Sequence, residues 1–325
     1  MSTVRARRMA EATRSPVLDR RLEPRTTDAI EVAGLAIPRA GNVTIEIDGH
    51  ELSLTSLDRA LYPEARFTKA DSIAYHLAVS DLLLHELRDR ALTVGRFPGG
   101  VDGRGFAQTE IPGRPPWVRA VPLALAKGPV KAFTLVDERA TLVWLAQMGV
   151  IELHTFLGRA HDLEHPTDVL FDLDPTPPAG LLEAADVALL LRERLGAMGL
   201  DARAKTSGSA GMHVLVSARP GATYAETRAL AGGLAKELAE ARPDLVSDRV
   251  MGRVERAGRV LVDVRQNAMR LTTIVAYSLR AARLPTVSTP VSWDEIRLAC
   301  EQRDPSLLVF TAADVVRRMA IDASD

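Results

Sequence analysis

The chain has 325 residues, 46% of them hydrophobic, which is enough for one large or two ordinary domains with a buried core. The 41 basic and 42 acidic residues give a net charge of −1, which does not by itself indicate a nucleic-acid-binding protein. One cysteine, Cys300, excludes an intramolecular disulfide and suits a reducing compartment. No run approaches the roughly 18 apolar residues of a membrane span, and the start lacks the apolar core of a secretory signal. A cytoplasmic protein without membrane attachment is therefore predicted.

The sequence changes character at about residue 40. Residues 1–40 are rich in Arg, Pro, Thr and Glu without a period, which predicts a mobile tail. Alternation begins at "NVTIEIDGHELSLTS", where Asp48 and Gly49 are a hairpin turn signal between two strands. Next, "FTKADSIAYHLAVSDLLLHELRDRA" has the apolar spacing of a helix, which Thr68 and Asp71 open as a capping box.

The rest of the chain alternates between strand and helix patterns, after a long irregular connection from Phe97 to Pro116. The expected elements are a strand near Phe133–Val136, a helix around Ala140–Gln147, a strand over Asp168–Asp174, a helix with Val187, Leu191, Leu195 and Met198, two short strands about "TSGSAG", a helix that Thr223 and Glu226 cap and Pro243 ends, and strands in "GRVLVDVRQN" and "LTTIVAYS". No repeat and no linker follow residue 40. We therefore expect an α/β (α+β) fold with a mixed sheet covered by helices, in one domain over residues 41–320. A two-lobed core is compatible with the same pattern.

Two carboxylates stand one residue apart in "VLFDLDPTPP". Alternation along a strand puts Asp172 and Asp174 on one face and turns Leu173 toward a core. Two neighbouring carboxylates repel each other unless a cation lies between them. Three explanations remain open: a strand that ends in a polar turn, a divalent-metal site, and a phosphoryl-transfer nucleophile.

A third strand carboxylate, Asp263, lies in "RVLVDVRQN". Buried without a partner it would cost several kcal/mol, so it needs a cation, a partner or solvent. Three carboxylates that converge on one sheet face would hold two Mg²⁺ or Mn²⁺ ions. Two such ions, about 4 Å apart, stabilise both oxygens of an in-line phosphoryl displacement.

The loop "KTSGSAGMHV" lies between these acidic segments. The backbone N–H groups of Ser207, Gly208, Ser209 and Gly211 are suited to bind a phosphate, and His213 follows on the next strand. An ordinary hairpin turn followed by a structural histidine is the competing explanation.

Together, "VLFDLDP", "TSGSAGMHV" and "VLVDVRQN" resemble the three motifs of archaeo-eukaryotic primase-polymerases, and most closely those of the polymerase domain of bacterial ligase D. The flanking segments "LTSLDRALYPEARFTKAD", "TLVWLAQMGVIELH" and "TTIVAYSLRAARLPTVSTPVSWDEI" agree, so the resemblance runs from about residue 43 to 315. It implies a primase-polymerase core with a mixed, RRM-like catalytic sheet and an N-terminal α/β lobe.

The resemblance also implies roles for individual residues. Asp172, Asp174 and Asp263 would be the catalytic ligands of two Mn²⁺ or Mg²⁺ ions. The nucleotide would lie near His154, Ser207, Gly208, His213, Arg256, Gln266 and Arg280. A DNA 5′-phosphate and the template would be bound by Arg59, Lys69 and Phe106.

Several positions depart from the family pattern. Ala210 stands where the glycine loop usually has a lysine, and Ala107 and Thr109 replace an aromatic residue and a lysine; a basic residue is also usual near Gly95. Each lost contact between an ammonium group and a phosphate costs about 1.5–3 kcal/mol. We therefore expect weaker nucleotide and DNA-end binding with the carboxylates retained.

The implied function is nucleotidyl transfer, of ribonucleotides in preference, to DNA 3′ ends at gaps or breaks in end joining. The implied partners are DNA ends or gapped duplex, an NTP or dNTP, and candidate proteins such as Ku and a separate DNA ligase, since the length leaves no room for a ligase module. A cytoplasmic, nucleoid-associated protein is expected.

Two alternatives compete with this function. "DLDPT" also fits the opening motif of haloacid-dehalogenase-like phosphatases, but that motif belongs near the start of its fold and needs a later acidic pair, where only Asp263 is present. The other alternative is a catalytically weak paralogue that acts as a DNA-end or partner-binding module. The lost basic positions argue against strong DNA binding, and the three retained carboxylates argue against decay.

Overall fold

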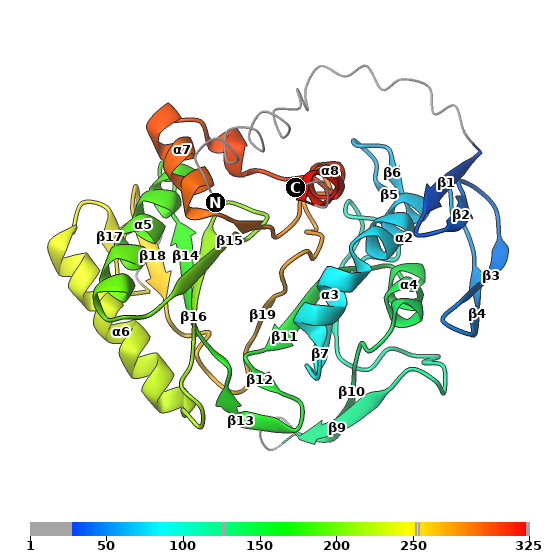
Figure 1. Cartoon of the computed structure of the whole chain (residues 1–325), viewed down its shortest axis with the longest axis horizontal. Coiled ribbons are helices and arrows are strands. Elements are labelled where there is room, and N and C mark those ends of the chain that lie inside the picture. Colours follow the sequence, from blue (N-terminus) through cyan, green and yellow to red (C-terminus); the bar gives the residue numbers. More distant parts are fainter. Residues whose placement is uncertain (1–27, 125–127, 251, 253, 323–325) are drawn as a thin grey trace. The chain divides into compact units, whose positions relative to one another are not determined.

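The computed structural model describes residues 28–124, 128–250, 252 and 254–322, and these form two compact units (Figure 1). Within that range, unit 1 comprises Phe156–Thr273 and Val287–Phe310. Unit 2 comprises residues 28–155, Ile274–Thr286 and the helix after Thr311. The sequence predicted one domain over 41–320. The sequence shows no domain boundary because the chain passes between the two units several times, so no single linker separates them.

Unit 1 is built on a six-stranded mixed sheet in the order β17-β18-β14-β16-β15-β20. Its strands are β14 (Asp168–Pro175), β15 (Ala202–Thr206), β16 (Met212–Ser217), β17 (Val246–Ser247), β18 (Val260–Asp263) and β20 (Pro290–Val291). The pairing of β17 with β18 is parallel and the other pairs are antiparallel. The expected mixed sheet is therefore confirmed.

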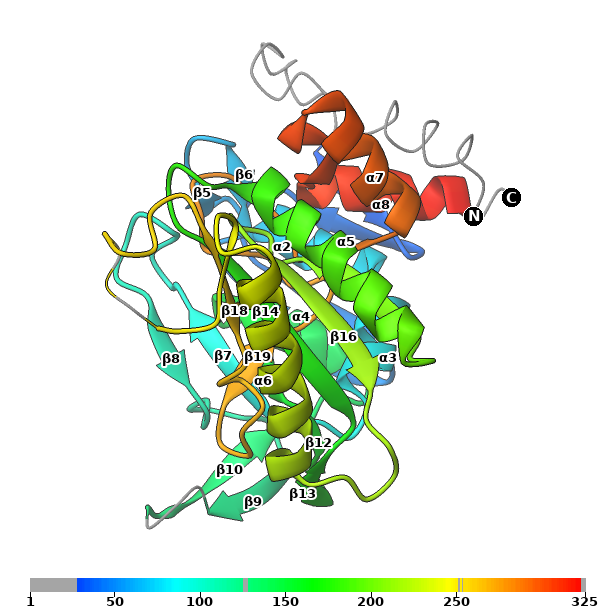
Figure 2. The same ribbon diagram turned by 90° about the vertical axis from the view of Figure 1, so that its left-hand side faces the viewer.

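Helices α5 (Leu181–Ala197) and α6 (Tyr224–Ala241) pack against this sheet and contact β14 (Figure 2). The core face of β14 carries Val169, Phe171 and Leu173, which are all buried. The unit is completed by β12 (Gly158–Arg159), β13 (Asp162–Pro166), α7 (Trp293–Gln302) and the 3₁₀ helix η1 (Pro305–Leu308). Because helices cover one face of the sheet, polar residues of β14 are directed to the other.

Most of a second sheet, in the order β19-β11-β7-β8, belongs to unit 2; its strands are β7 (Leu92–Arg96), β8 (Phe106–Gln108), β11 (Val150–Phe156) and β19 (Thr272–Ile274). The helices of unit 2 are α2 (Lys69–Ala78), α3 (Ser80–Leu87), α4 (Arg139–Gln147) and α8 (Ala312–Asp322). Four two-stranded pairs accompany them: β1 (Ala29–Val32) with β2 (Leu35–Pro38), β3 (Val43–Ile47) with β4 (His50–Leu54), β5 (Ala60–Tyr62) with β6 (Phe67–Thr68), and β9 (Ala120–Ala124) with β10 (Val130–Thr134).

Local sequence signals are confirmed wherever they specify backbone geometry. Asp48 and Gly49 have φ values of 52° and 80°, as the tight turn between β3 and β4 requires. Thr68 caps α2 and Thr223 caps α6, each in a complete capping box. The long helix expected after Thr68 is divided into α2 and α3 at Val79.

The predicted tail over residues 1–40 is wrong at its C-terminal end. Residues 29–38 form the β1–β2 hairpin, Ile37 is fully buried, and Arg39 pairs with Asp71 at 3.2 Å. The apolar residues of this hairpin gain a core only when α2 packs on it, which composition does not reveal. Residues 1–27 lie outside the described part of the chain. No described helix is long and apolar enough to span a membrane.

Candidate active site

The three sequence-predicted carboxylates lie on neighbouring strands of unit 1. Asp172 of β14 is the direct cross-strand partner of Asp263 of β18, and Asp174 lies one alternation further along β14. Directly opposed residues share a face of the sheet, as do residues i and i+2 of one strand. All three carboxylates therefore emerge on the face opposite Leu173, with Asp263 only 8% exposed and Asp174 exposed.

Asp263 has the cationic partner that its burial demanded. The guanidinium of Arg265 donates through Nε to Oδ1 at 2.9 Å and to Oδ2 at 3.0 Å, and the Arg265 backbone N–H also donates to Oδ1 at 2.9 Å. The hydrogen bond and charge of Asp263 raise the pKa of Arg265, and Asp172 and Asp174 add smaller contributions. Arg265 thus lies in the field of all three carboxylates and engages both oxygens of one.

His213 joins the same face from the other side of β14. It is the cross-strand partner of Asp172, and its Nε2 lies 3.3 Å from Asp172 Oδ1. The Oγ1 atom of Thr273 lies 3.5 Å from the other ring nitrogen, Nδ1, and the imidazole is almost fully buried. The strand pair therefore fixes one side of the Asp172 carboxylate.

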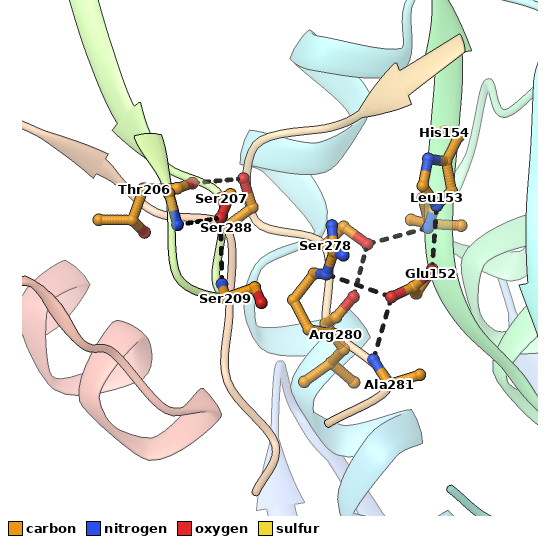
Figure 3. Close-up of polar contacts among 12 residues, drawn as sticks. Glu152, Leu153, His154, Thr206, Ser207, Ser209, Ser278, Arg280, Ala281 and Ser288 are labelled. Atoms are coloured by element: carbon orange, nitrogen blue, oxygen red, sulfur yellow. Dashed lines mark hydrogen bonds and ion pairs between the residues drawn. The ribbon is translucent and has the colours of Figure 1, made fainter. Parts of the chain in front are cut away.

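The glycine loop between β15 and β16 is held by its own hydrogen bonds. Ser207 Oγ accepts from the N–H groups of Ser209 and Gly211, each at 3.2 Å, and Ser207 N–H donates to Gly211 O (Figure 3). A Cβ on Gly211 would lie 2.2 Å from the carbonyl oxygen of Leu173. Glycine is required there because the loop backbone packs directly on β14 between the two Asp positions.

Two more predicted nucleotide-binding residues lie in unit 1. Arg256, which is almost fully buried, places Nη1 3.9 Å from Asp174 Oδ2. Gln266 Oε1 is buried and accepts no hydrogen bond from the described residues. An unsatisfied buried acceptor costs free energy, so a ligand donor at this position would be favourable.

The donor set of this face suits a hard divalent cation, since Asp172, Asp174 and Asp263 supply carboxylate oxygens. Among the described residues, however, no three acidic, histidine or cysteine side chains are grouped so that they could hold an ion as they stand. Arg265 donates to both oxygens of Asp263 and would compete with an ion for that carboxylate. A metal ligated by all three would have to displace that guanidinium.

The remaining nucleotide-binding predictions, His154 and Arg280, lie in unit 2, where one carboxylate holds both (Figure 3). Glu152 Oε2 lies 3.1 Å from His154 Nε2, and Glu152 Oε1 lies 3.1 Å from Arg280 Nε. Burial alone would raise the pKa of Glu152, but the hydrogen bond from His154 and the charge of Arg280 outweigh it and lower the pKa.

The predicted DNA-contacting residues also belong to unit 2. Arg59 donates to the carbonyl of Pro98, and the buried Lys69 donates to that of Thr55, each at 2.9 Å. Burial, followed by the charge of Arg59, lowers the pKa of Lys69. Phe106 is 44% exposed on β8, and the Arg96 guanidinium lies 5.6 Å from its ring centroid. An exposed aromatic ring beside a cation is suited to stacking with a base.

Sequence reasoning did not single out Arg265 or Glu152. The signals were nevertheless present: a cation two residues after a strand carboxylate, and a carboxylate two residues before His154 on the same strand. Both spacings place the two side chains on one face of an extended chain.

The family model described as "LigD, primase-polymerase domain" matches residues 68–324, which is most of the chain. The chain belongs to this family. The primase-polymerase fold expected from the three motifs is thereby confirmed.

Among curated proteins, this LigD-family chain is 32% identical over 280 residues to the multifunctional non-homologous end joining protein LigD of Mycobacterium bovis, covering 83% of this chain and 36% of that protein. It is 34% identical over 246 residues to the LigD protein of Pseudomonas aeruginosa, covering 73% of this chain and 28% of that protein. The chain thus spans well under half the length of these relatives.

A solved structure of the polymerase domain of Mycobacterium tuberculosis ligase D in complex with DNA matches with a TM-score of 0.76 and 32% identity, covering 83% of this chain and 95% of that one. The match therefore extends over nearly all of that polymerase domain.

Proposed function

We propose that this LigD-family chain is a two-metal nucleotidyltransferase. It adds nucleotides, ribonucleotides in preference, to DNA 3′ ends at gaps or breaks during end joining. The observation that carries the proposal is the cross-strand pairing of Asp172 with Asp263, with Asp174 on the same face. The similarity to a ligase D polymerase domain that was solved with DNA supports DNA as the substrate. Ku and a DNA ligase activity are the partners that end joining would supply.

Each residue has a role in this proposal. When bound, two Mn²⁺ or Mg²⁺ ions supply positive charge to the attacking and leaving oxygens of the phosphoryl transfer. Asp172, Asp174 and Asp263 would hold them, and His213 keeps Asp172 in place.

The other predicted residues would recognise the nucleotide and the DNA. Arg256 and Arg280 would bind phosphate oxygens, since a guanidinium matches a phosphate in bidentate geometry. The buried Gln266 Oε1 would accept a hydrogen bond from the nucleotide, and Ser207 and Gly208 would border the phosphates. His154 would bind the sugar, and Arg59, Lys69 and Phe106 would bind the DNA.

The test is extension of a labelled gapped duplex with each NTP and dNTP in Mn²⁺. We expect product from the wild type and a loss of about 100-fold or more in Asp263→Ala, because several kcal/mol of charge stabilisation are removed. The matched control is Asp201→Ala, the same change at an exposed position of unit 1. Extension that persists in folded Asp263→Ala would show that the reaction does not use this carboxylate.

Two observations favour a second candidate, a weakly active module that binds DNA ends or a partner. Arg265 engages both oxygens of Asp263, and Ala210 and Thr109 stand where the resemblance leads one to expect lysines. Such a module would bind duplex ends without metal-dependent nucleotide binding. Product absent from both wild type and Asp263→Ala, with end binding retained, would favour it over the polymerase.

A further inference from the structure

Glu152 occupies an unusual place on strand β11. The β11–β7 pairing skips one residue between Val150 and Glu152, so a β-bulge immediately precedes Glu152. A bulge re-aims the side chain that follows it and is common beside functional sites. On the partner strand the residue opposite is Gly95, where an added Cβ would lie 3.0 Å from Glu152 Cβ and 3.2 Å from Oε2. The structure therefore keeps the space around this carboxylate clear.

Three donors from two parts of the chain converge on the Glu152 carboxylate (Figure 3). Oε2 accepts a hydrogen bond from His154 Nε2, on the same face of β11, at 3.1 Å. Oε1 accepts from both Arg280 Nε and the backbone N–H of Ala281, each at 3.1 Å. Glu152 is 17% exposed, so these contacts are made largely out of water, where charge-assisted hydrogen bonds are strong.

The backbone of the same strand holds the segment that carries Arg280. The Leu153 N–H donates to Ser278 Oγ at 2.9 Å, and the Val275 N–H donates to Leu153 O at 3.0 Å. Ser278 Oγ in turn donates to Leu279 O. The main chain from Val275 to Leu279 is thus held by contacts that do not involve Glu152, whose own contacts in this segment are the Ala281 amide and the Arg280 side chain.

The chemistry of each contact determines what the donors can still bind. An ionised carboxylate only accepts hydrogen bonds, so His154 Nε2 must carry the proton in this pair. In the neutral imidazole that leaves Nδ1 as an acceptor, which is what a sugar hydroxyl donor requires. The Arg280 contact is made through Nε, so the pair of terminal guanidinium nitrogens is not needed for it and can bind phosphate oxygens.

We propose that Glu152 is the positioning residue for nucleotide recognition in this chain. It fixes the tautomer and ring orientation of His154 for a ribose hydroxyl, and it orients Arg280 for the triphosphate. The inference rests on the proposed function, because His154 and Arg280 are nucleotide-binding residues only within it. Glu152 itself contacts neither the nucleotide nor the reacting atoms.

The experiment measures binding of a fluorescent ribonucleotide, mant-ATP with Mn²⁺, to the full chain, together with KM and kcat of gap extension. Glu152→Gln keeps the shape but offers a single carbonyl acceptor for three donors. We expect affinity for mant-ATP to fall about tenfold and KM to rise to match, with kcat changed less than about twofold. Glu46→Gln, the same change at an exposed site of unit 2, is the control and should behave as the wild type.

Two further variants separate positioning from folding. In the double variant Glu152→Gln/His154→Ala, the loss should be clearly smaller than the product of the single losses, since both act through one histidine. Gly95→Ala retains the charge and displaces Glu152, and it should weaken mant-ATP binding several-fold even if Glu152→Gln does not fold. Unchanged affinity in folded Glu152→Gln or in Gly95→Ala, with wild-type binding intact, would overturn the role of Glu152 alone. Absence of mant-ATP binding by the wild type would overturn the proposed function and this inference with it.

Discussion

The two units of the molecule each hold a buried carboxylate against an arginine, but they do so in different ways. In unit 1 the partner of Asp263 is Arg265, two residues away, whose side chain is 53% exposed. In unit 2 the partner of Glu152 is Arg280, whose side chain is 24% exposed. The contact is long-range in sequence, since the adjacent Ala281, which also bonds Glu152, is 129 residues away.

The difference lies in what each pair holds together. The Asp263 pair is local and its guanidinium is half in water, so Arg265 can leave when another cation takes its place beside the buried carboxylate. The Glu152 pair joins β11 to a remote segment and is largely desolvated, so breaking it leaves a buried charge uncompensated. Arg265 is therefore suited to exchange with another cation at Asp263, whereas the Glu152–Arg280 pair is suited to a lasting structural contact.

Removal of the unit 2 arginine should have the largest effect on stability. Arg280→Ala leaves Glu152 with one backbone amide and one histidine, and we expect the free energy of unfolding to fall by about 3 kcal/mol. Urea unfolding followed by circular dichroism measures it. Arg283→Ala is the control: its ion pair with Glu64 is exposed on both sides, so a loss below about 1 kcal/mol is expected. Equal losses in the two variants would remove the contrast between buried and exposed pairs.

Removal of the unit 1 arginine should have a smaller effect, and the quantity that changes is the affinity for Mn²⁺, which should increase. In Arg265→Ala no guanidinium has to be displaced from Asp263, so Mn²⁺ should bind about tenfold more tightly, a gain of roughly 1.4 kcal/mol. Titration of free Mn²⁺ by electron paramagnetic resonance measures the affinity. Arg270→Ala, an exposed arginine farther along the same segment, should bind Mn²⁺ as the wild type does. An unchanged affinity in Arg265→Ala would mean that the guanidinium does not compete with the ion.

Acidification should weaken the Glu152–Arg280 pair gradually, and we expect this to be the smallest of the three effects. Burial opposes ionisation of Glu152, but His154, Arg280 and the Ala281 amide together lower its pKa below the usual 4.5. A carboxylate with a lowered folded-state pKa stabilises the fold above its unfolded pKa, and that contribution is lost as the pH falls through the folded value. The difference in melting temperature between the wild type and Glu152→Gln should be constant from pH 7 to about 5 and narrow below 4.5. A difference that stays constant to pH 3 would contradict an ionised Glu152.

Sequence reasoning succeeded where a few adjacent residues determine the geometry. The turn at Asp48 and Gly49, the capping boxes at Thr68 and Thr223, and the alternation around Asp172 specify their backbone locally. The cross-strand match of Asp172 with Asp263 is a tertiary fact, and it was expected because three motifs resemble one family.

The rest depended on contacts between distant segments. The β1–β2 hairpin becomes buried only against α2, and β11 follows α4 in an apolar stretch where helix and strand patterns are hard to distinguish. Glu152 looked like an ordinary charged residue beside His154. Its importance comes from Arg280 and Gly95, which reach it from elsewhere in the chain.

The interleaving of the units has a consequence for how this protein is made. Unit 1 requires residues up to Phe310, and unit 2 includes the helix that begins at Ala312. Domains built from continuous segments can fold one after another as they leave the ribosome. Here α8 packs against α2, so the first-made part of unit 2 gains this contact only after translation has passed the end of α8, and we expect unit 2 to complete its packing late in synthesis.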